Sequence, residues 1–418
     1  MAGVAGLRGT GDFGADERPK NFREAILFLD PQGSSPITAL TSKAKKKSVD
    51  DPEFSWWNET NVLIRLQVNG ALISTDTTVT VDSADPTSST LDINRGTATN
   101  LKPGDLLMVE PSADAVSFTP EMLEVVSVIS DTAFTVRRGV AGSSAAAIAD
   151  NAFLLLMGSA YAEGGTAPRA VTRNPIKFNN YTQIFKDSYE LTKTAEATRF
   201  RTGDPWSNDK KRKLFDHYMK IEWSFMFGQK NETGSSAENG KPIRYMGGLR
   251  QQIPSTRTTV FTGPVTFTGV NNNMLDAVYK VFDFSSPAGD TRMGFCGNAA
   301  LNALNKVAAT EENVRFNMNS TIKVYGMEFR EFIMPQGRLL IKTHPLLNQH
   351  GGIYSKSMFI LDFASINYVY LKGRDTKTMD DVQAKDEDVR RGFYQTECSM
   401  ALDRGGLTCA YLGNIIAS

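Results

Sequence analysis

The sequence predicts an α+β protein of several domains, and three stretches of the chain carry this prediction. Residues 61–160 contain period-two runs such as "TTVTV" and "LEVVSVI", separated by the turn sequences "KPGD" and "SDTA", which indicates an all-β module. Residues 206–227 contain neither Gly nor Pro, which predicts one long helix. Helical and strand patterns alternate further on. At 418 residues, a prior of about 100–200 residues per domain gives two to four domains.

Composition excludes several broad classes of protein. The 46 basic and 46 acidic residues balance, so no whole-chain field attracts nucleic acid or a membrane. Cys296, Cys398 and Cys409 are odd in number and widely spaced, which argues against a disulfide framework or a zinc site and favours a reducing cytosol. The N-terminus reaches acidic residues before any long apolar run, and the most apolar window, "NAFLLLMGSAYA", is shorter than the ~20 residues that span a bilayer. We expect a protein that is neither exported nor embedded in a membrane.

The first 58 residues predict an extended N-terminal arm, because they are rich in Gly, Pro and charge. A short helix is expected near "NFREAILFL". The basic run Lys43–Lys47 could contact phosphates or be solvated, and the sequence does not choose between these alternatives. "EFSWWNET" places Phe54, Trp56 and Trp57 together, which predicts a buried anchor.

The long helix follows "RTGDP", where Pro205 blocks helix upstream and Ser207 or Asn208 is expected to cap it. Gly228 is expected to end it. Its apolar arc is wider than one face and predicts a rod that is covered on several sides. The residues of this arc are Leu214, Phe215, Tyr218, Met219, Ile221, Trp223, Phe225, Met226 and Phe227. Glu222 falls inside the arc, so we expect it to have a hydrogen-bonding or cationic partner.

Four consecutive cations, Lys210, Lys211, Arg212 and Lys213, lie near the start of this helix. A helix N-terminus carries a partial positive charge, so each cation is disfavoured there by roughly 0.3–1 kcal/mol at low salt. We therefore expect these side chains to face charge outside their own helix. The alternative is four solvated side chains.

The last part of the chain predicts mixed secondary structure. Helices are expected near 272–284 and 298–309, and strands near 320–326, 328–336, 338–344, 358–363 and 366–373. The acidic segment 379–391 is expected to be exposed, and 392–417 is expected to form a closing strand pair around a Gly-Gly turn.

Signals for an enzyme are weak. "GSSAENGKP" differs from a phosphate-binding loop in its glycine spacing and in having Pro242 where the magnesium-binding Ser or Thr is required. The three histidines are His217, His344 and His350, and none lies in an HExxH motif. His217 is predicted on the polar edge of the long helix, in solvent. No catalytic residue, cofactor site or metal site is predicted.

The order of several stretches resembles a tailed-phage major capsid protein of the Hong Kong 97-type fold. These stretches are "FSWWNET", "AYAEGGTAP", "NNYTQIF", "RTGDP" with the long helix, "NGKPIRYMGGL", "YGMEFREFIMPQGRLLI", "MFILDF" and "GFYQTECSMALDRGGLTCAYL". The resemblance implies an N-terminal arm (1–58), an E-loop with an inserted all-β domain (59–165) and a P domain (166–245) with a spine helix at 207–228. An A domain with the remaining P-domain strands (246–385) and C-terminal strands (386–418) would follow.

The resemblance implies a subunit that assembles into hexamers and pentamers, forming an icosahedral or prolate shell around double-stranded DNA. Its implied partners are other copies of itself, scaffolding, portal and decoration proteins, and DNA bound without sequence specificity. It would reside in the virion, and in the host cytoplasm during assembly. The cations of the helix would then face the acidic segment 380–388 of the same or a neighbouring subunit, or packaged DNA. The alternative from a different class is a phage-associated enzyme with an accessory β module.

We expect seven residues to contact other subunits or DNA. These are Trp56, Trp57, Lys210, Lys211, Arg212, Lys213 and Glu222.

Overall fold

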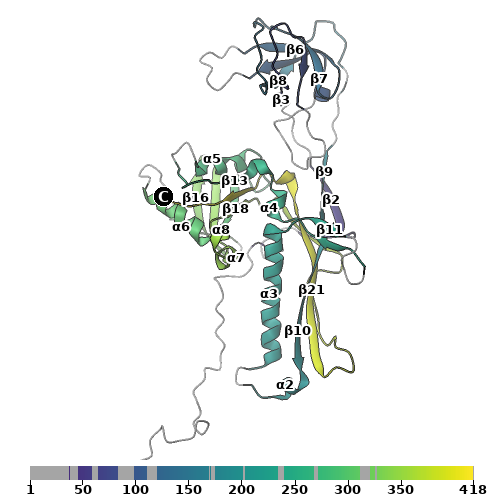
Figure 1. Ribbon diagram of the computed structural model, residues 1–418, viewed down its shortest axis with the longest axis vertical. Coiled ribbons are helices and arrows are strands. Elements are labelled where there is room, and N and C mark those ends of the chain that lie inside the picture. Colours follow the sequence, from purple (N-terminus) through teal and green to yellow (C-terminus); the bar gives the residue numbers. More distant parts are fainter. Residues whose placement is uncertain are drawn as a thin grey trace, which may run out of the picture.

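The computed structural model confirms the α+β class and shows an elongated body with a separate β module at one end (Figure 1). It describes residues 37, 46–58, 65–82, 98–110, 120–168, 170, 175–200, 203–233, 240–267, 272–310, 321–324 and 327–417. The helix expected near residues 22–29 lies outside the described residues. The body consists of two sheets and one long helix.

The first sheet of the body is built on one long antiparallel pair of strands. β10 (Gln183–Thr192) pairs with β21 (Val389–Leu402) along its whole length. The sheet continues through β19 (Ile366–Leu371) to β1 (Lys46–Val49), which pairs with β19 in parallel, and β20 (Lys377–Met379) adds to β21. Part of the N-terminal arm is therefore an edge strand of the body.

The spine helix α3 (Pro205–Phe227) lies along the β10 and β21 pair (Figure 1). It begins two residues before the predicted start, because the cap is Asp204 and not Ser207 or Asn208. The Asp204 carboxylate accepts hydrogen bonds from the backbone N–H groups of Trp206 and Ser207, and Pro205 occupies the first helical position. Of the nine residues of the predicted apolar arc, Ile221, Phe225 and Met226 are buried and the other six are half-buried. A short helix, α2 (Lys193–Ala197), follows β10.

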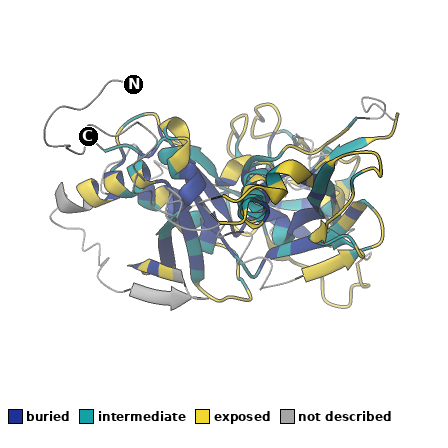
Figure 2. Ribbon diagram, turned by 90° about the horizontal axis from the view of Figure 1, so that it is seen from below, coloured by how far each residue is buried: buried dark blue, intermediate teal, exposed yellow. Residues whose placement is uncertain are grey.

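The second sheet of the body has seven strands in mixed orientation. Their order is β13 (Thr258–Val260), β22 (Ala410–Gly413), β18 (Met358–Leu361), β14 (Thr291–Cys296), β17 (Gly337–Thr343), β16 (Met327–Met334) and β15 (Thr321–Val324). The helical elements around it are α5 (Met274–Val278), α6 (Asn298–Thr310), α7 (Pro345–Gln349), α8 (Gly352–Ser355), η2 (Ser255–Arg257) and η3 (Tyr279–Phe282). All four residues of β18 are buried, because the sheet is covered on both faces. Figure 2 shows this concentration of buried residues in the strands.

The expected closing strand pair is wrong. β21 belongs to the first sheet and β22 lies between β13 and β18 in the second. Between them, η4 (Asp403–Gly406) turns the chain from one sheet into the other, with positive φ angles at Arg404, Gly405 and Gly406. The chain therefore joins the two sheets at this point.

Strands between Arg65 and Ser159 form a six-stranded antiparallel sheet, which we call the module. Its strands, in spatial order, are β3 (Arg65–Gln67), β8 (Phe153–Ser159), β5 (Asp105–Val109), β6 (Met122–Val128), β7 (Ala133–Arg137) and β4 (Thr78–Thr80), and η1 (Ala98–Asn100) precedes β5. Alternate residues point inward, and the buried core contains only residues between Leu66 and Leu154. The module has its own hydrophobic core.

A two-stranded ribbon, which we call the stem, joins the module to the body. It pairs β2 (Glu53–Asn58) with β9 (Ile176–Tyr181), and the module lies beyond its outer end (Figure 1). Near its base are a second small ribbon, β11 (Asn231–Thr233) with β12 (Ile243–Tyr245), and the short helix α4 (Leu249–Gln252).

Candidate functional site

The stem separates the two tryptophans that the sequence placed together. Successive side chains of a strand point to opposite faces, so Trp56 lies with Phe54 and Trp57 does not. Trp56 stacks between Phe54 and Phe178, with ring centroids 5.8 and 6.1 Å away. Trp57 is 60% exposed. The prediction of a buried anchor is thus correct for Phe54 and wrong for Trp57, which leaves an indole on the surface of the stem.

A cavity of about 260 Å³ lies between the stem and the body. Trp56 and Phe178 line it from the stem, and Gln251 and Gln252 line it from the body. The indole Nε1–H of Trp56 and the side-chain amide nitrogen of Asn58 are buried without a hydrogen-bond partner among the described residues. The stem therefore holds two donors whose burial is costly unless a further acceptor reaches them.

Two of the four cations of α3, Lys210 and Lys213, form ion pairs within the chain. Lys210 Nζ lies 2.6 Å from Asp380 Oδ2, in the acidic segment of the same chain, and Tyr189 donates to the other oxygen of Asp380 at 2.5 Å. The hydrogen bond from Lys210, followed by that from Tyr189, lowers the pKa of the Asp380 carboxyl. Lys213 lies 3.8 Å from Asp216, and Lys211 is exposed. The acidic segment expected to face these cations thus supplies a partner for Lys210.

The observed start of α3 also lowers the electrostatic cost of these four cations. Because α3 begins at Pro205, Lys210 is its sixth residue, and the four cations lie in the second and third turns. The partial charge of a helix terminus acts mainly within the first turn, so the cost of placing cations here is smaller than expected.

Glu222 is fully buried and has the partners that the sequence required. Its Oε1 accepts hydrogen bonds from the backbone N–H of Ile37 at 2.7 Å and from His344 Nε2 at 2.8 Å. His344 Nδ1 accepts from the Leu346 N–H at 3.3 Å, so Nε2 carries the hydrogen that Glu222 accepts. One carboxylate therefore joins the spine helix, the start of α7 and the N-terminal arm.

His217 is not on a solvated edge, and that prediction is wrong. It is fully buried between α3 and the first sheet, where Nδ1 lies 2.8 Å from Asp187 Oδ2 and Nε2 lies 2.8 Å from Thr396 Oγ1. Lys220 also donates to Asp187. The hydrogen-bonded series Thr396, His217 and Asp187 resembles a catalytic triad, but all three side chains are buried. The three residues therefore fasten α3 to β10 and β21.

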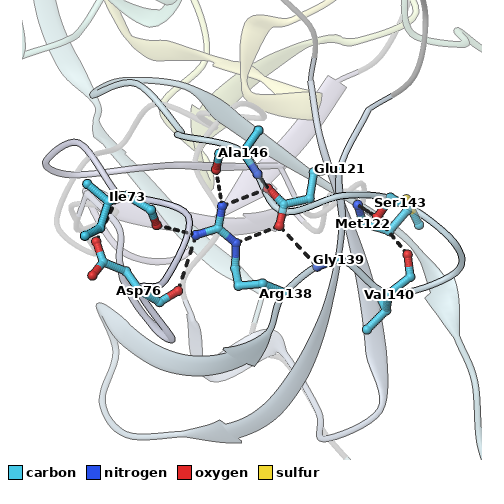
Figure 3. Close-up of polar contacts among 9 residues, drawn as sticks. All are labelled: Ile73, Asp76, Glu121, Met122, Arg138, Gly139, Val140, Ser143 and Ala146. Atoms are coloured by element: carbon cyan, nitrogen blue, oxygen red, sulfur yellow. Dashed lines mark hydrogen bonds and ion pairs between the residues drawn. The ribbon is translucent and has the colours of Figure 1, made fainter.

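The module contains a buried ion pair that sequence reasoning missed (Figure 3). Arg138 binds Glu121 through two hydrogen bonds of 2.7 Å, and the two side chains are only 6% and 4% exposed. Arg138 also donates to the carbonyl oxygens of Ile73, Asp76 and Ala146, from two loops. The residues next to Arg138 in the sequence do not indicate this ion pair, because Glu121 lies 17 residues away.

Opposing effects act on the Glu121 carboxyl. Burial alone raises its pKa, but the hydrogen bond from Arg138 and those from the backbone N–H groups of Ala146 and Gly139 outweigh burial. The pKa of Glu121 is lowered as a result. The pair is ionised at neutral pH and closes the two loops over one end of the module.

Comparison with known proteins decides the family. The sequence model described as SU10 major capsid protein matches residues 7–406. The chain belongs to this family. A major capsid protein of Pseudomonas phage PaMx41 is 27% identical over 366 residues, covering 86% of this chain and 80% of the relative.

Solved structures that are similar to this chain were also found. One from Mycobacterium phage Bobi has 7% identity, covers 96% of each chain and gives a TM-score of 0.44. The capsid of a native GTA particle has 8% identity, covers 98% of each chain and gives a TM-score of 0.43.

Family membership resolves the choice between classes. Members are major capsid proteins, so this chain is a structural protein of a phage capsid, and the enzyme alternative is not retained. Within the described residues no group of three or more metal-ligating side chains was found. No helix among them combines the length and apolar character needed to cross a bilayer.

Proposed function

We propose that this capsid protein assembles into hexamers and pentamers that form an icosahedral or prolate shell around double-stranded DNA. The observation that supports this most directly is the stem, which holds a folded module outside the body (Figure 1). The face of the stem that carries Phe54 packs on the body against Val369 and Ala401, whereas Trp57 on the opposite face is exposed. A neighbouring subunit that covers this exposed face would bury it.

The stem has the surface expected of a contact region. Trp57 is 60% exposed and Trp56 carries an unpartnered buried donor among the described residues. Tryptophan supplies a large contact area and is enriched at the energetic centre of interfaces. We propose that Trp57 packs against a neighbouring subunit and that Lys211, Arg212 and Lys213 contact a neighbour or DNA, while Glu222 acts from inside its own subunit.

The proposed domains follow the ranges expected from the sequence. These are the arm (1–58), the E-loop with its inserted module (59–165), the P domain (166–245), the A domain with remaining P-domain strands (246–385) and the C-terminal strands (386–418). The module lies within the second range, while the stem strands β2 and β9 fall in the arm and P-domain ranges, and α3 on β10 supports the third range. The pairing of β21 with β10 supports placing β21 with the P domain.

The proposed partners follow from what a closed shell requires. A closed shell needs an entry for DNA and a template for its size, so we propose portal and scaffolding proteins as partners, with decoration proteins on the outside. Assembly would take place in the host cytoplasm. DNA would be bound without sequence specificity through exposed cations.

Negative-stain microscopy of the expressed chain, alone and with the scaffold of its phage, tests the proposal. Shells, sheets or rings are expected, and a monodisperse monomer under both conditions would contradict assembly. A variant without residues 1–50 should remain folded but assemble poorly, because it loses the edge strand β1 and the bond from Ile37 to Glu222. A shorter deletion of residues 1–15 is the control, and unchanged particle yield from the longer deletion would contradict a role for the arm.

A further inference from the structure

A cluster of aromatic side chains lies partly exposed on the body beside the position where the N-terminal arm is held. Trp223 packs against Phe227, His350 and Tyr354, with ring centroids 5.1, 4.9 and 5.2 Å apart. Tyr354 is 38% exposed and its neighbour Ile353 is 73% exposed. Large apolar side chains grouped on a surface mark contact sites more often than single ones do. We call Trp223, Phe227, His350, Ile353 and Tyr354 the aromatic surface.

Ile37 shows where the arm meets the body. It is fully buried, and its N–H donates to Glu222, the residue directly before Trp223 on α3. Glu222 also binds His344, at the start of α7, and His350 lies at the other end of that helix. The contact of Ile37 with Glu222 and the aromatic surface therefore involve the same two elements of the body, α3 and α7.

The sequence before Ile37 has the pattern of an amphipathic helix. Phe22, Ala25, Ile26 and Leu29 follow the spacing i, i+3, i+4, i+7, which gives an apolar stripe, and Leu27 and Phe28 are apolar residues outside this stripe. Amphipathic helices bind to apolar surfaces through side chains at this spacing. The aromatic surface is such a surface, and the segment 21–29 is a matching occupant.

The tether between them limits where this segment can bind. Eight Cα steps join Leu29 to Ile37, and at most about 3.6 Å per step gives a reach of roughly 29 Å. Exposed Phe200, at the opposite end of α3, lies before Asp204, and the rise from Glu222 to Asp204 alone is about 27 Å. The aromatic surface begins at Trp223, the residue next to Glu222, and this position is well within the reach of roughly 29 Å.

We propose that residues 21–29 bind the aromatic surface of the same chain as an amphipathic helix, with the bond from Ile37 to Glu222 setting the position of the arm. The arm would then be placed by its own subunit before assembly. This inference concerns the single subunit and does not depend on hexamers or pentamers, so its failure is separate from a failure of the proposed shell.

Disulfide trapping tests the proposal in the full chain. The Ile26→Cys, Ile353→Cys double variant is oxidised mildly, and a disulfide requires the two Cα atoms to come within about 7 Å. The native Cys296, Cys398 and Cys409 are fully buried, and burial raises the pKa of Cys296 and of Cys409 to about 12, so they react poorly. The matched control places the first cysteine at Leu27, on the opposite side of the predicted helix.

We expect a disulfide within one chain in the Ile26 variant, seen as a monomer on a non-reducing gel and confirmed by peptide mapping, and much less in the Leu27 control. A covalent dimer would overturn the proposal, because the occupant would then belong to a second copy. No disulfide, or equal yields in both variants, would also overturn it.

A fluorescence measurement covers the case in which the cysteine variants fold poorly. Acrylamide quenching of the parent is compared with that of Trp223→Phe, which isolates the signal of Trp223. The Ile26→Asp substitution should increase quenching of that signal, and Leu27→Asp should leave it closer to the parent value. Identical quenching in all three chains would show that nothing from this segment covers Trp223.

Discussion

The module and the body obtain their cores in different ways. The core of the module uses residues from one stretch of chain, between Leu66 and Leu154. The core around α3 gathers residues from Ile37 to Tyr411. Each region also has its own buried polar contacts, Arg138 with Glu121 in the module and histidine with carboxylate in the body. The module has the properties of an independent domain, whereas the body draws its cores from chain on both sides of the module.

Removing the module should give the largest effect on assembly and a small effect on the body. We expect a chain in which residues 62–160 are replaced by a short Gly/Ser linker to fold, because both body cores remain complete. Its shells should be fragile or absent, since a specific contact typically buries ~800 Å² per partner and the module can supply such an area. Circular dichroism and particle yield after heating measure the two effects. Particles as heat-stable as the parent would show that the module does not hold the shell together.

This difference also explains which parts of the fold the sequence predicted. Strands β4, β6 and β7 were located from alternating side chains, because a short strand in a local sheet depends mainly on its own pattern. The helix near 298–309 and the strands from 328 to 371 were predicted for the same reason. Local pattern does not report which strands pair, and so β21 and β22 were joined in error.

The candidate site was predicted only in part, for a related reason. The sequence required a partner for Glu222, since a lone carboxylate in an apolar arc is costly, but it could not identify His344, which is 122 residues away. His217 was placed in solvent because its buried partners, Asp187 and Thr396, come from two distant strands. Trp57 was grouped with Phe54 by proximity in sequence, although strand geometry puts them on opposite faces.

The buried ion pair of the module offers the next largest effect. Arg138→Met leaves Glu121 buried without its cation, which should destabilise the module by about 3–5 kcal/mol. The neighbouring Arg137→Met is the matched control, because Arg137 pairs with Glu124 while 66% exposed, and such pairs contribute about 0.2–1 kcal/mol. Hydrogen exchange of β6 and β7 reports on the module, and tryptophan fluorescence reports on the rest, since all four tryptophans lie outside it. Equal destabilisation by both variants would contradict the special role of Arg138.

The carboxylate that joins the arm to the body should have a smaller effect, located outside the module. Glu222→Leu removes the acceptor for the Ile37 N–H and for His344 Nε2, and each buried donor left unsatisfied costs about 1–3 kcal/mol. Denaturant unfolding followed by fluorescence measures the loss. Glu232→Leu is the control, because Glu232 is partly exposed and pairs with Arg244 on a small ribbon. A stability equal to that of the control would show that the arm is not held by Glu222.

Acid should destabilise the module through Glu121. The pKa of this carboxyl is lower in the folded protein than its ordinary value of 4.5. Its contribution is therefore complete above the ordinary value and is lost as the pH falls through the lower folded pKa. We expect hydrogen-exchange protection of β6 and β7 to fall below pH 4.5, more steeply in the parent than in Glu121→Gln. The same pH dependence in both chains would assign the effect to other groups.

The cations of the spine helix should give the smallest effect on the subunit itself. Lys210 and Asp380 are 31% and 37% exposed, and ion pairs of this kind contribute about 0.2–1 kcal/mol, so replacing residues 210–213 by Gln should barely change unfolding. Assembly is the more sensitive measurement, because several exposed cations act together on a neighbouring charged surface. We expect the fourfold variant to assemble less well at low salt and nearly as well as the parent at high salt, since charges are screened over ~10 Å at 0.1 M. The single variant Lys210→Gln separates the pair with Asp380 from the other three cations. A defect that persists at high salt would show that the side chains act by packing, and no defect at low salt would show that residues 210–213 have no role in assembly.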